Sequence, residues 1–248
     1  MLDNKLKPKR SFDLLRIGKK NDGGYLVEKN SYKNSEFLIG VGINDDWSFE
    51  KNFKKNFIGI DNQISSKFLV KIFFIKFFRF FYTFCLIDIL NSFFKIIEFN
   101  FIKHNFLKLT LSNYTDLSKG IVSLDWVLQS YCLGCNKIFL KIDIEGSEYR
   151  ILDDIILIQD KICGLVIEMH DIDININKII KFIDEIDMDL THIHGNNFAG
   201  LDSNSDPLVI ELTFSKNPKE ISGPVILPNT LDYPNDKNKP ELNLNFKK

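Results

Sequence analysis

The chain has 248 residues, of which 44% are hydrophobic and 26% are charged, and its formal net charge is −1. This length fits one domain with decorations better than two full domains, and the composition is typical of a folded globular protein. Because the net charge is close to zero, the chain has no overall positive potential that would attract nucleic acid, which argues against nucleic acid as a partner. The first residues contain no apolar stretch of the kind found in a signal peptide, so we expect a cytoplasmic protein.

Two short apolar strands are predicted in the first quarter of the chain. Residues 37–43 form an apolar run that contains Gly40 and Gly42, and residues 57–61 form a second run that ends in Asp61. Short apolar runs of this kind alternate with amphipathic stretches along the rest of the chain. That alternation is typical of βαβ units built around a parallel sheet.

A Phe-rich insert follows at about residues 65–100, which we expect to be helical over residues 67–94, with a strand near 94–101. No uncharged run in it reaches the ~18 residues that a membrane-spanning helix needs. The insert could form a buried helix pair, a lid over the site or a homo-oligomer contact, or alternatively an interfacial membrane helix. Because its positive charges are scattered around the helical wheel, we expect it to cover the sheet or the pocket without a lipid requirement. The interrupting charges are Lys67, Lys71, Lys76, Arg79 and Asp88.

The second half of the chain predicts four further strands, at residues 138–144, 164–170, 190–194 and 208–214. The last two have no helix between them, which indicates an antiparallel hairpin at the edge of the sheet. Such a hairpin separates the methyltransferase form of this architecture from the fully parallel dinucleotide-binding form. We therefore predict an α/β fold: a class I methyltransferase Rossmann-like doubly wound sheet with a terminal antiparallel β-hairpin. A single domain would span residues 1–248, with a packed C-terminal tail over about 217–248.

The glycine pair and the acid at the first two strand ends predict a nucleoside-type cofactor. Gly40 and Gly42 allow a ligand to approach the backbone closely, because glycine has no Cβ. Asp61 can accept hydrogen bonds from a ribose diol. A dinucleotide-binding fingerprint would have a third glycine where this chain has Asp45. The acids Asp45, Asp46 and Glu50 suit a sulfonium cofactor with an ammonium group better than a pyrophosphate.

Ionisable side chains gather at the ends of three later strands, at the edge where open α/β sheets bind ligands. Alternation places the members of each set on one side of its strand. Such a cluster could deprotonate a hydroxyl as a base, or hold a divalent metal ion that lowers the pKa of that hydroxyl, and both alternatives stay open. The sets are Lys141, Asp143 and Glu145, then Glu168 and His170, then His192, His194, Asn196 and Asn197.

Together these motifs resemble the FkbM-type S-adenosylmethionine-dependent methyltransferases. The most specific one, Lys-Ile-Asp-Ile-Glu-Gly-Ser-Glu at 141–148, is similar to that family's lysine–aspartate–glutamate–glycine signature. The resemblance covers about 16–246 apart from the insert, and it implies a class I fold, S-adenosylmethionine and O-methylation, often of sugars or natural products. Residues 37–40 depart from the family pattern, because no acid precedes the glycines. Further similar motifs are Arg16-Ile-Gly18, Asp22-Gly-Gly-Tyr25, Ser48-Phe-Glu50, Ser123-Leu-Asp125, Glu168-Met-His170, His194-Gly-Asn-Asn197 and Leu231-Asp-Tyr-Pro-Asn235.

The resulting hypothesis is an O-methyltransferase that modifies a hydroxyl of a sugar, or of a sugar-nucleotide or polysaccharide precursor. Acceptor chemistry is assigned to Asp143, Glu145, His170 and His194, and the metal alternative uses Asp143, His170 and His194. Cofactor binding is assigned to Asp22, Gly23, Gly24, Tyr25, Gly40, Gly42 and Asp61.

Two other functions compete with this hypothesis. One is an NAD-dependent oxidoreductase of Rossmann type, against which Asp45 and the terminal hairpin both argue. The other is a non-enzymatic membrane-surface adaptor that uses the Phe-rich insert. The expected partner is a small-molecule or sugar-nucleotide acceptor, and peripheral membrane contact and a homo-oligomer remain options.

Overall fold

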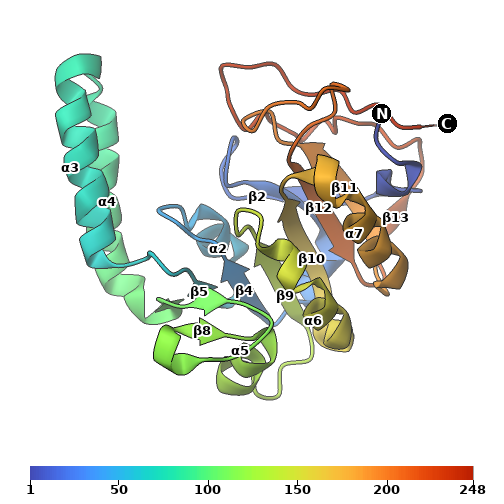
Figure 1. Cartoon of the computed structure of the whole chain (residues 1–248), viewed down its shortest axis with the longest axis horizontal. Helices are drawn as coiled ribbons and strands as arrows, with labels where there is room; N and C mark the ends of the chain where they lie inside the picture. The colour runs from blue at the N-terminus through green and yellow to red at the C-terminus, as the bar shows by residue number, and fades with distance from the viewer. Residues whose placement is uncertain (248) are drawn as a thin grey trace.

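A seven-stranded sheet forms the centre of the molecule in the computed structural model, which describes residues 1–247 (Figure 1). Its strand order is β11-β12-β10-β9-β4-β5-β6. The pairings from β6 through β5, β4 and β9 to β10 are parallel, and β12 is antiparallel to both of its neighbours. The strands are β4 (Phe37–Val41), β5 (Asn56–Ile60), β6 (Phe106–Leu107), β9 (Ile138–Ile142), β10 (Ile162–Met169), β11 (Asp189–Gly195) and β12 (Ile210–Ser215).

The antiparallel hairpin expected from the sequence is confirmed, because β11 and β12 pair with each other and no helix lies between them. The hairpin folds back, so that the last strand, β12, pairs with β10 and leaves β11 at the edge. In chain order the sheet therefore reads 3-2-1-4-5-7-6, with only the seventh strand reversed. This is the doubly wound α/β fold predicted above.

Helices and a small hairpin cover both faces of the sheet, because the central strands are apolar on both sides. Ile39, Leu140 and Ile167 face α5 (Leu124–Tyr131), α6 (Leu152–Leu157) and α7 (Ile172–Glu185). Leu38 and Phe139 face α1 (Lys29–Asn34), α2 (Ser48–Phe53) and the antiparallel pair β2 (Leu14–Ile17) and β3 (Tyr25–Glu28). Residues that alternate along one strand thus serve two separate cores.

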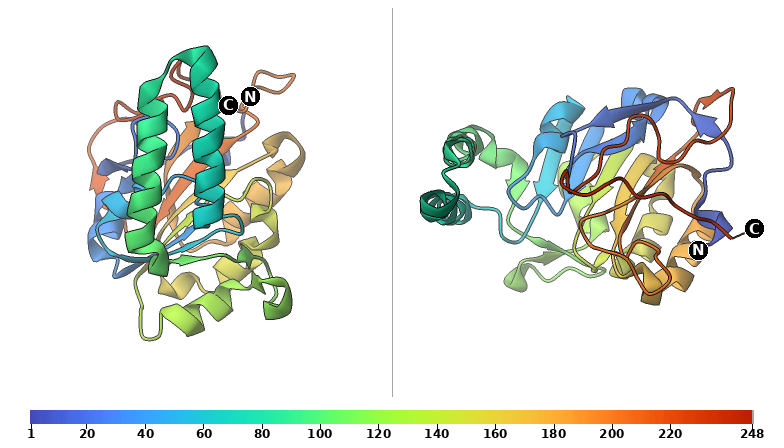
Figure 2. Two further views of the ribbon diagram at one scale, coloured as in Figure 1. Left: turned by 90° about the vertical axis from the view of Figure 1, so that its left-hand side faces the viewer. Right: turned by 90° about the horizontal axis from the view of Figure 1, so that it is seen from above.

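The Phe-rich insert forms two antiparallel helices, α3 (Ser66–Thr83) and α4 (Leu86–Ile102). They pack on each other and project from the rest of the molecule, as Figures 1 and 2 show. Only their base joins the core, where Leu69 and Phe99 pack with Trp47 and Phe106. The predicted helices are confirmed, but the prediction that they cover the sheet or the pocket is wrong, because they pack on each other and none of their residues lines the cavity described below. No helix within residues 1–247 is long and apolar enough to cross a membrane.

The strand predicted near residues 94–101 is also wrong, because these residues belong to α4. Aromatic and β-branched residues favour strands only weakly, and packing decides between the two structures. Here Ile96, Phe99 and Ile102, at helical spacing, meet Phe106 and Trp47 on one side of α4. A strand would have divided these side chains between two faces.

The C-terminal segment from Asn217 runs over the surface and returns to the N-terminus. Its strand β13 (Glu220–Ile221) pairs with β1 (Ser11–Phe12), and Phe246 forms a bridge with Leu2. The remaining short elements are η1 (Asn4–Leu6), η2 (Lys103–Asn105), β7 (Thr110–Leu111), η3 (Leu117–Lys119), β8 (Ile121–Val122), η4 (Glu148–Arg150) and η5 (Gln159–Lys161).

Candidate active site

A cavity of about 640 Å³ opens at the carboxyl ends of β4, β5, β9 and β10. Open α/β sheets bind ligands at this edge, beside the point where the strand order reverses. Seven of the residues predicted from the sequence line the cavity: Asp22, Gly23, Gly42, Asp61, Asp143, Glu145 and His170. Four others lie outside its described lining: Gly24, Tyr25, Gly40 and His194.

The two glycines of the first strand end have different roles. Gly42 has φ +77°, and a Cβ there would lie 1.4 Å from the carbonyl oxygen of Asp143, so only glycine fits between these strand ends. Gly40 lies inside β4, where a Cβ would come within 2.5 Å of Glu50 Oε1. Gly42 therefore shapes the cavity, whereas Gly40 makes room for a buried side chain.

Asp61 holds the two loops that frame one half of the cavity. Its Oδ2 accepts a hydrogen bond from the Asn44 amide at 2.8 Å, and its Oδ1 accepts from the amides of Gln63 at 2.7 Å and Ile64 at 3.1 Å. A carboxylate offers about four lone-pair sites, so Oδ2 retains capacity for one more donor. Asp61 can therefore order the loops and bind a hydroxyl at the same time.

The acid expected to face an ammonium group has other partners here. Asp45 lies on the cavity rim, where Lys95 Nζ donates to its backbone oxygen and lies 3.2 Å from Oδ2. Lys76 Nζ lies 3.5 Å from the same carboxylate oxygen. Burial raises the pKa of Asp45, but these two ammonium groups outweigh it and lower the pKa overall. Asp45 thus joins the rim to the middle of the α3–α4 hairpin.

The β2–β3 hairpin places Tyr25 behind the acidic side of the cavity. Asp22 and Gly23 line the cavity directly, and Gly24 has no space for a side chain, because a Cβ would overlap the carbonyl oxygen of Lys19. The Tyr25 ring is buried against Phe49 with an edge-to-face geometry. This packing fixes the direction of its hydroxyl.

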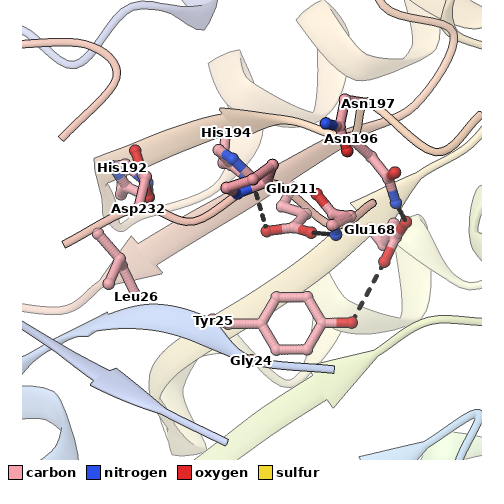
Figure 3. A network of polar contacts seen from close by, with 12 residues as sticks. Gly24, Tyr25, Leu26, Glu168, His192, His194, Asn196, Asn197, Glu211 and Asp232 are labelled. Atoms are coloured by element: carbon pink, nitrogen blue, oxygen red, sulfur yellow. Dashed lines mark hydrogen bonds and ion pairs between the residues drawn. The ribbon is translucent and has the colours of Figure 1, made fainter. Parts of the chain in front are cut away.

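Asp143, Glu168 and His170 form a compact cluster in the cavity, with one potential ligand atom from each within 4.8 Å of the others. The Tyr25 hydroxyl lies 3.3 Å from Asp143 Oδ2 and 3.2 Å from Glu168 Oε2, and it can donate to either. Asn196 Nδ2 donates to Glu168 Oε1 at 2.6 Å (Figure 3). Burial, and then the charge of Asp143, raise the pKa of Glu168 well above its usual value.

His170 is oriented by a buried carboxylate outside the cavity. Its Nδ1 donates to Glu148 Oε1 at 2.9 Å, and its Nε2 lies 3.5 Å from Oε2 of the exposed Glu145. Burial lowers the pKa of His170, but the hydrogen bond to Glu148 and the surrounding carboxylates outweigh it and raise the pKa to about 9. Glu148 thereby holds the ring so that Nε2 remains for a ligand or for Glu145.

A buried lysine balances part of this negative charge. Lys141 Nζ donates to the carbonyl oxygen of Gly42 at 2.9 Å and lies 3.6 Å from Asp143 Oδ2. Burial lowers the pKa of Lys141, but Asp143 and Glu50 outweigh it and raise the pKa, so the ammonium stays charged. Burial raises the pKa of Glu50 to about 7, although the positive charge of Lys141 acts to lower it.

His194 belongs to a separate network, which corrects the predicted grouping with Asp143 and His170. Its Nδ1 lies 3.1 Å from Glu211 Oε2 and its Nε2 lies 2.9 Å from Glu241 Oε1, while His192 Nε2 lies 2.9 Å from Asp232 Oδ1 (Figure 3). The prediction took the strands of these residues to be near neighbours in the sheet, and in the structure β12 lies between β10 and β11. These histidines therefore hold the C-terminal segment against the sheet.

In the structure Glu168, and not His194, joins Asp143 and His170 in the cluster. Its position two residues before His170 puts both side chains on one side of β10, and this alternation was the signal available in the sequence. Asn196 was also visible, at the end of β11, and it reaches the cluster through Glu168.

Comparison with known proteins gives one family match, over part of the chain. Residues 121–197 match the family model of the Methyltransferase FkbM domain. No curated protein matches the chain. Among solved structures, the chain is similar to M. capricolum TrmK in complex with S-adenosyl-homocysteine, its natural cofactor product, with 12% sequence identity and a TM-score of 0.34. The alignment covers 76% of this chain and spans 66% of the length of TrmK.

The matched segment runs from β8 to the end of β11 and contains all of β9 and β10. It therefore includes Asp143, Glu168 and His170, the three residues of the acidic and imidazole cluster. This part of the chain is therefore similar to the FkbM methyltransferase domain, and the family match is limited to it.

Proposed function

We propose that this protein is an S-adenosylmethionine-dependent methyltransferase and that it transfers a methyl group to a hydroxyl oxygen of a sugar, or of a sugar-nucleotide or polysaccharide precursor. The observation that carries the proposal is one cavity with two chemically distinct ends. Asp61 and apolar side chains such as Ile43 and Leu109 line it beside β4, β5 and β6, and Asp143, Glu168 and His170 line it beside β9 and β10. A nucleoside-type cofactor and a hydroxylated acceptor would then share one enclosed space.

The first end has the features expected of a nucleoside site. Asp61 keeps a free acceptor position beside an apolar slot, which suits a ribose diol with an adjoining base. Bound there, S-adenosylmethionine would supply an electrophilic methyl group. The protein's part is to hold the two reactants in line and to exclude water from between them.

The second end suits a molecule with several hydroxyl groups. Carboxylate and amide side chains converge there, from Asp22, Asp143, Glu168 and Asn196. Such groups bind sugar hydroxyls through paired hydrogen bonds, and they would be costly to bury beside an apolar acceptor. This polarity supports a sugar-like acceptor over an apolar one.

The acceptor hydroxyl must lose a proton, and the cluster fits a divalent cation for that purpose. Asp143, Glu168 and His170 offer two carboxylates and one imidazole at a common point, a donor set that suits Mg²⁺, Mn²⁺ or Fe²⁺. Glu148 and Tyr25 orient these groups from behind, as supporting residues do at metal sites. A cation held there would lower the pKa of the acceptor hydroxyl. Without one, Nε2 of His170 is the remaining candidate base, in the fraction of molecules whose imidazole is neutral despite its raised pKa.

Calorimetry and a transfer assay test the proposal separately. S-adenosylhomocysteine should bind the purified protein, whereas NAD should not, and methyl-labelled cofactor should label a hydroxylated sugar acceptor in a panel of sugars and sugar nucleotides. Binding of NAD with no binding of S-adenosylhomocysteine would refute the cofactor assignment. Labelling confined to apolar acceptors would refute the acceptor class.

A further inference from the structure

Phe198 is an exposed aromatic residue at the edge of the cavity. It lies in the loop that leads from β11 to β12, and it lines the cavity together with its neighbour Ala199. Phe198 is 66% exposed, and it belongs to none of the hydrophobic core clusters formed by residues 1–247. An aromatic ring that lines a cavity without packing into a core is available to a ligand.

Two buried asparagines directly before Phe198 hold its backbone in place. Asn196 Nδ2 donates to Glu168 Oε1 at 2.6 Å (Figure 3), and its Oδ1 accepts from the Phe198 amide at 2.8 Å. Asn197 Oδ1 accepts from the amide of Asp236 in the C-terminal segment at 2.7 Å. Because a single side chain joins Phe198 to Glu168, the backbone that carries the ring has a fixed place relative to the cluster.

Lys239 of the C-terminal segment supports the same loop. Its Nζ donates to the carbonyl oxygen of Asn197 at 3.2 Å and lies 5.8 Å from the centre of the Phe198 ring. One ammonium group covers only one face of a ring, so the other face is left for a ligand. Because the loop is ordered before a ligand arrives, binding costs less conformational entropy.

The charges around the cavity restrict the kind of molecule that can lie against this ring. Among the described lining residues the basic side chains are Lys141 and His170, and Lys141 already lies beside Asp143. A phosphate group would therefore meet mainly carboxylates, which is unfavourable, whereas a hydroxyl group can donate to a carboxylate. The acidic lining residues are Asp22, Asp45, Asp46, Asp61, Asp143, Glu145 and Glu168.

A pyranose ring matches a site in which an aromatic side chain lies near a set of carboxylates. It carries hydroxyl groups around its edge, while its two faces expose C–H groups. The face of an aromatic ring is negative, so it attracts the polarised C–H groups of a sugar. Phe198 can therefore bind one face of a pyranose while Asp143 and Glu168 accept hydrogen bonds from hydroxyl groups at its edge.

We propose that Phe198 is the platform on which the acceptor stacks, and that the acceptor is a pyranose that presents no charged group to the cavity. The inference rests on the proposed function and narrows its acceptor class. The C–H face of the sugar lies on the ring, which turns an edge hydroxyl toward Asp143, Glu168 and His170. Phe198 thus determines specificity and takes no part in the methyl or proton transfer.

Sugar binding by variants of Phe198 tests this inference. Saturation-transfer NMR measures binding of the methyl pyranosides of glucose, galactose and mannose to the full chain loaded with S-adenosylhomocysteine. Phe198→Leu keeps an apolar side chain but removes the aromatic face, so the dissociation constant of the bound sugar should rise about tenfold. In the transfer assay KM for the sugar should rise with it, and kcat should change less than KM. Phe198→Trp should bind the sugar at least as tightly as wild type.

Leu201 supplies a matched control in the same loop. It is 47% exposed and lies outside the described lining of the cavity, so Leu201→Ala should bind the sugar as wild type does. Circular dichroism establishes that each variant is folded. The affinity for S-adenosylhomocysteine, measured by calorimetry, should be equal in all of them. A loss of that affinity in Phe198→Leu would place the ring in the cofactor site and overturn the inference.

The remaining outcomes separate this inference from the proposed function. Equal sugar affinity in wild type and Phe198→Leu overturns the platform and leaves the methyltransferase proposal intact. The inference also fails if no pyranoside binds wild type, or if the 6-phosphate of the bound sugar binds more tightly than the neutral sugar. By contrast, wild type that does not bind S-adenosylhomocysteine, or that labels only apolar acceptors, refutes the proposed function itself.

Discussion

The Tyr25 hydroxyl lies 3.2 Å from Oε2 of Glu168, although the two residues come from different layers of the fold. Tyr25 reaches the cluster from the β2–β3 hairpin, and Glu168 reaches it from the middle of the sheet. Burial, and then the nearby carboxylates of Asp143 and Glu168, raise the pKa of Tyr25 well above its usual value, so the hydroxyl keeps its proton. It therefore acts as a permanent donor to the cluster.

Replacing Tyr25 with Phe should weaken catalysis without weakening cofactor binding. The ring and its packing on Phe49 would remain, but Asp143 and Glu168 would lose a shared donor. We expect kcat/KM for methyl transfer to fall by about tenfold, as for other residues that orient a site from behind. S-adenosylhomocysteine affinity, measured by calorimetry, should be unchanged. A tenfold loss of that affinity would instead assign Tyr25 to the cofactor end.

Replacing Asp61 with Ala should weaken binding of S-adenosylhomocysteine by about 1–3 kcal/mol, because a charged acceptor of ribose hydroxyls is lost. Asp61→Asn should bind with intermediate affinity, since it keeps one acceptor oxygen for the loop amides. The exposed Asp160 provides a control, whose alanine variant should bind as wild type. Calorimetry reports all three, and equal affinities would remove Asp61 from the cofactor site.

Metal chelation decides how the acceptor hydroxyl is activated. If a divalent cation is held by Asp143, Glu168 and His170, EDTA should abolish methyl transfer and added Mg²⁺ or Mn²⁺ should restore it. His170→Ala and Glu168→Gln should then lose bound metal, measured by mass spectrometry, and lose about 10²-fold or more in activity.

The exposed His104 supplies the matched control for the metal experiment, since His104→Ala should retain both metal and activity. Activity that is insensitive to EDTA, together with loss of activity in His170→Ala alone, would favour His170 as a base. That result would contradict the metal proposal and leave the methyltransferase assignment intact.

The ion pairs of His194 should make stability depend on pH in the alkaline range. Burial lowers the pKa of His194, but Glu211 and Glu241 outweigh it and raise the pKa to about 11 in the folded protein. The unfolded chain would titrate near 6.5. Because the folded pKa is the higher one, the stabilisation is complete below about pH 6.5 and is lost as pH rises toward 11.

Melting curves of wild type and His194→Gln measure this contribution directly. The difference in melting temperature between the two proteins should be largest near pH 6 and should shrink steadily toward pH 10. The comparison of two proteins cancels the other groups that titrate in this range. A difference that stays constant or grows with pH would show that His194 is neutral in the folded state.

The sequence was informative about individual strands and less so about their neighbours. The apolar runs at 37–41 and 138–142 could be assigned to buried strands from their length and residue types, and the missing helix before residue 208 indicated the final hairpin. The order β10-β12-β11 depends on contacts between distant residues, which no local pattern contains. For the same reason the sequence could group histidines by type, but it could not show that Glu168 rather than His194 joins Asp143.

The helical insert illustrates a second limit of local patterns. Its mixture of Phe, Ile and Lys is compatible with a strand, a buried helix or a surface helix. These three structures differ in which of the same side chains they bury, and the composition does not show which ones are buried. Only the packing of α4 on α3, and of Phe99 on Phe106, decides the outcome. The exposure of residues such as Phe84 could be seen only once that packing was known.

The position of β12 also determines when the sheet can be completed during synthesis. Strand β11 has β12 as its sole neighbour in the described sheet, and one edge of β10 is paired by β12 as well. Until Ile210–Ser215 has left the ribosome, the nascent chain would present β10 with an open edge and β11 with no partner. Open strand edges are sites of misassembly between chains, so chaperone dependence should end only after this last strand emerges. Nascent chains halted before residue 210 should accordingly remain aggregation-prone, although they already contain every residue of the acidic and imidazole cluster.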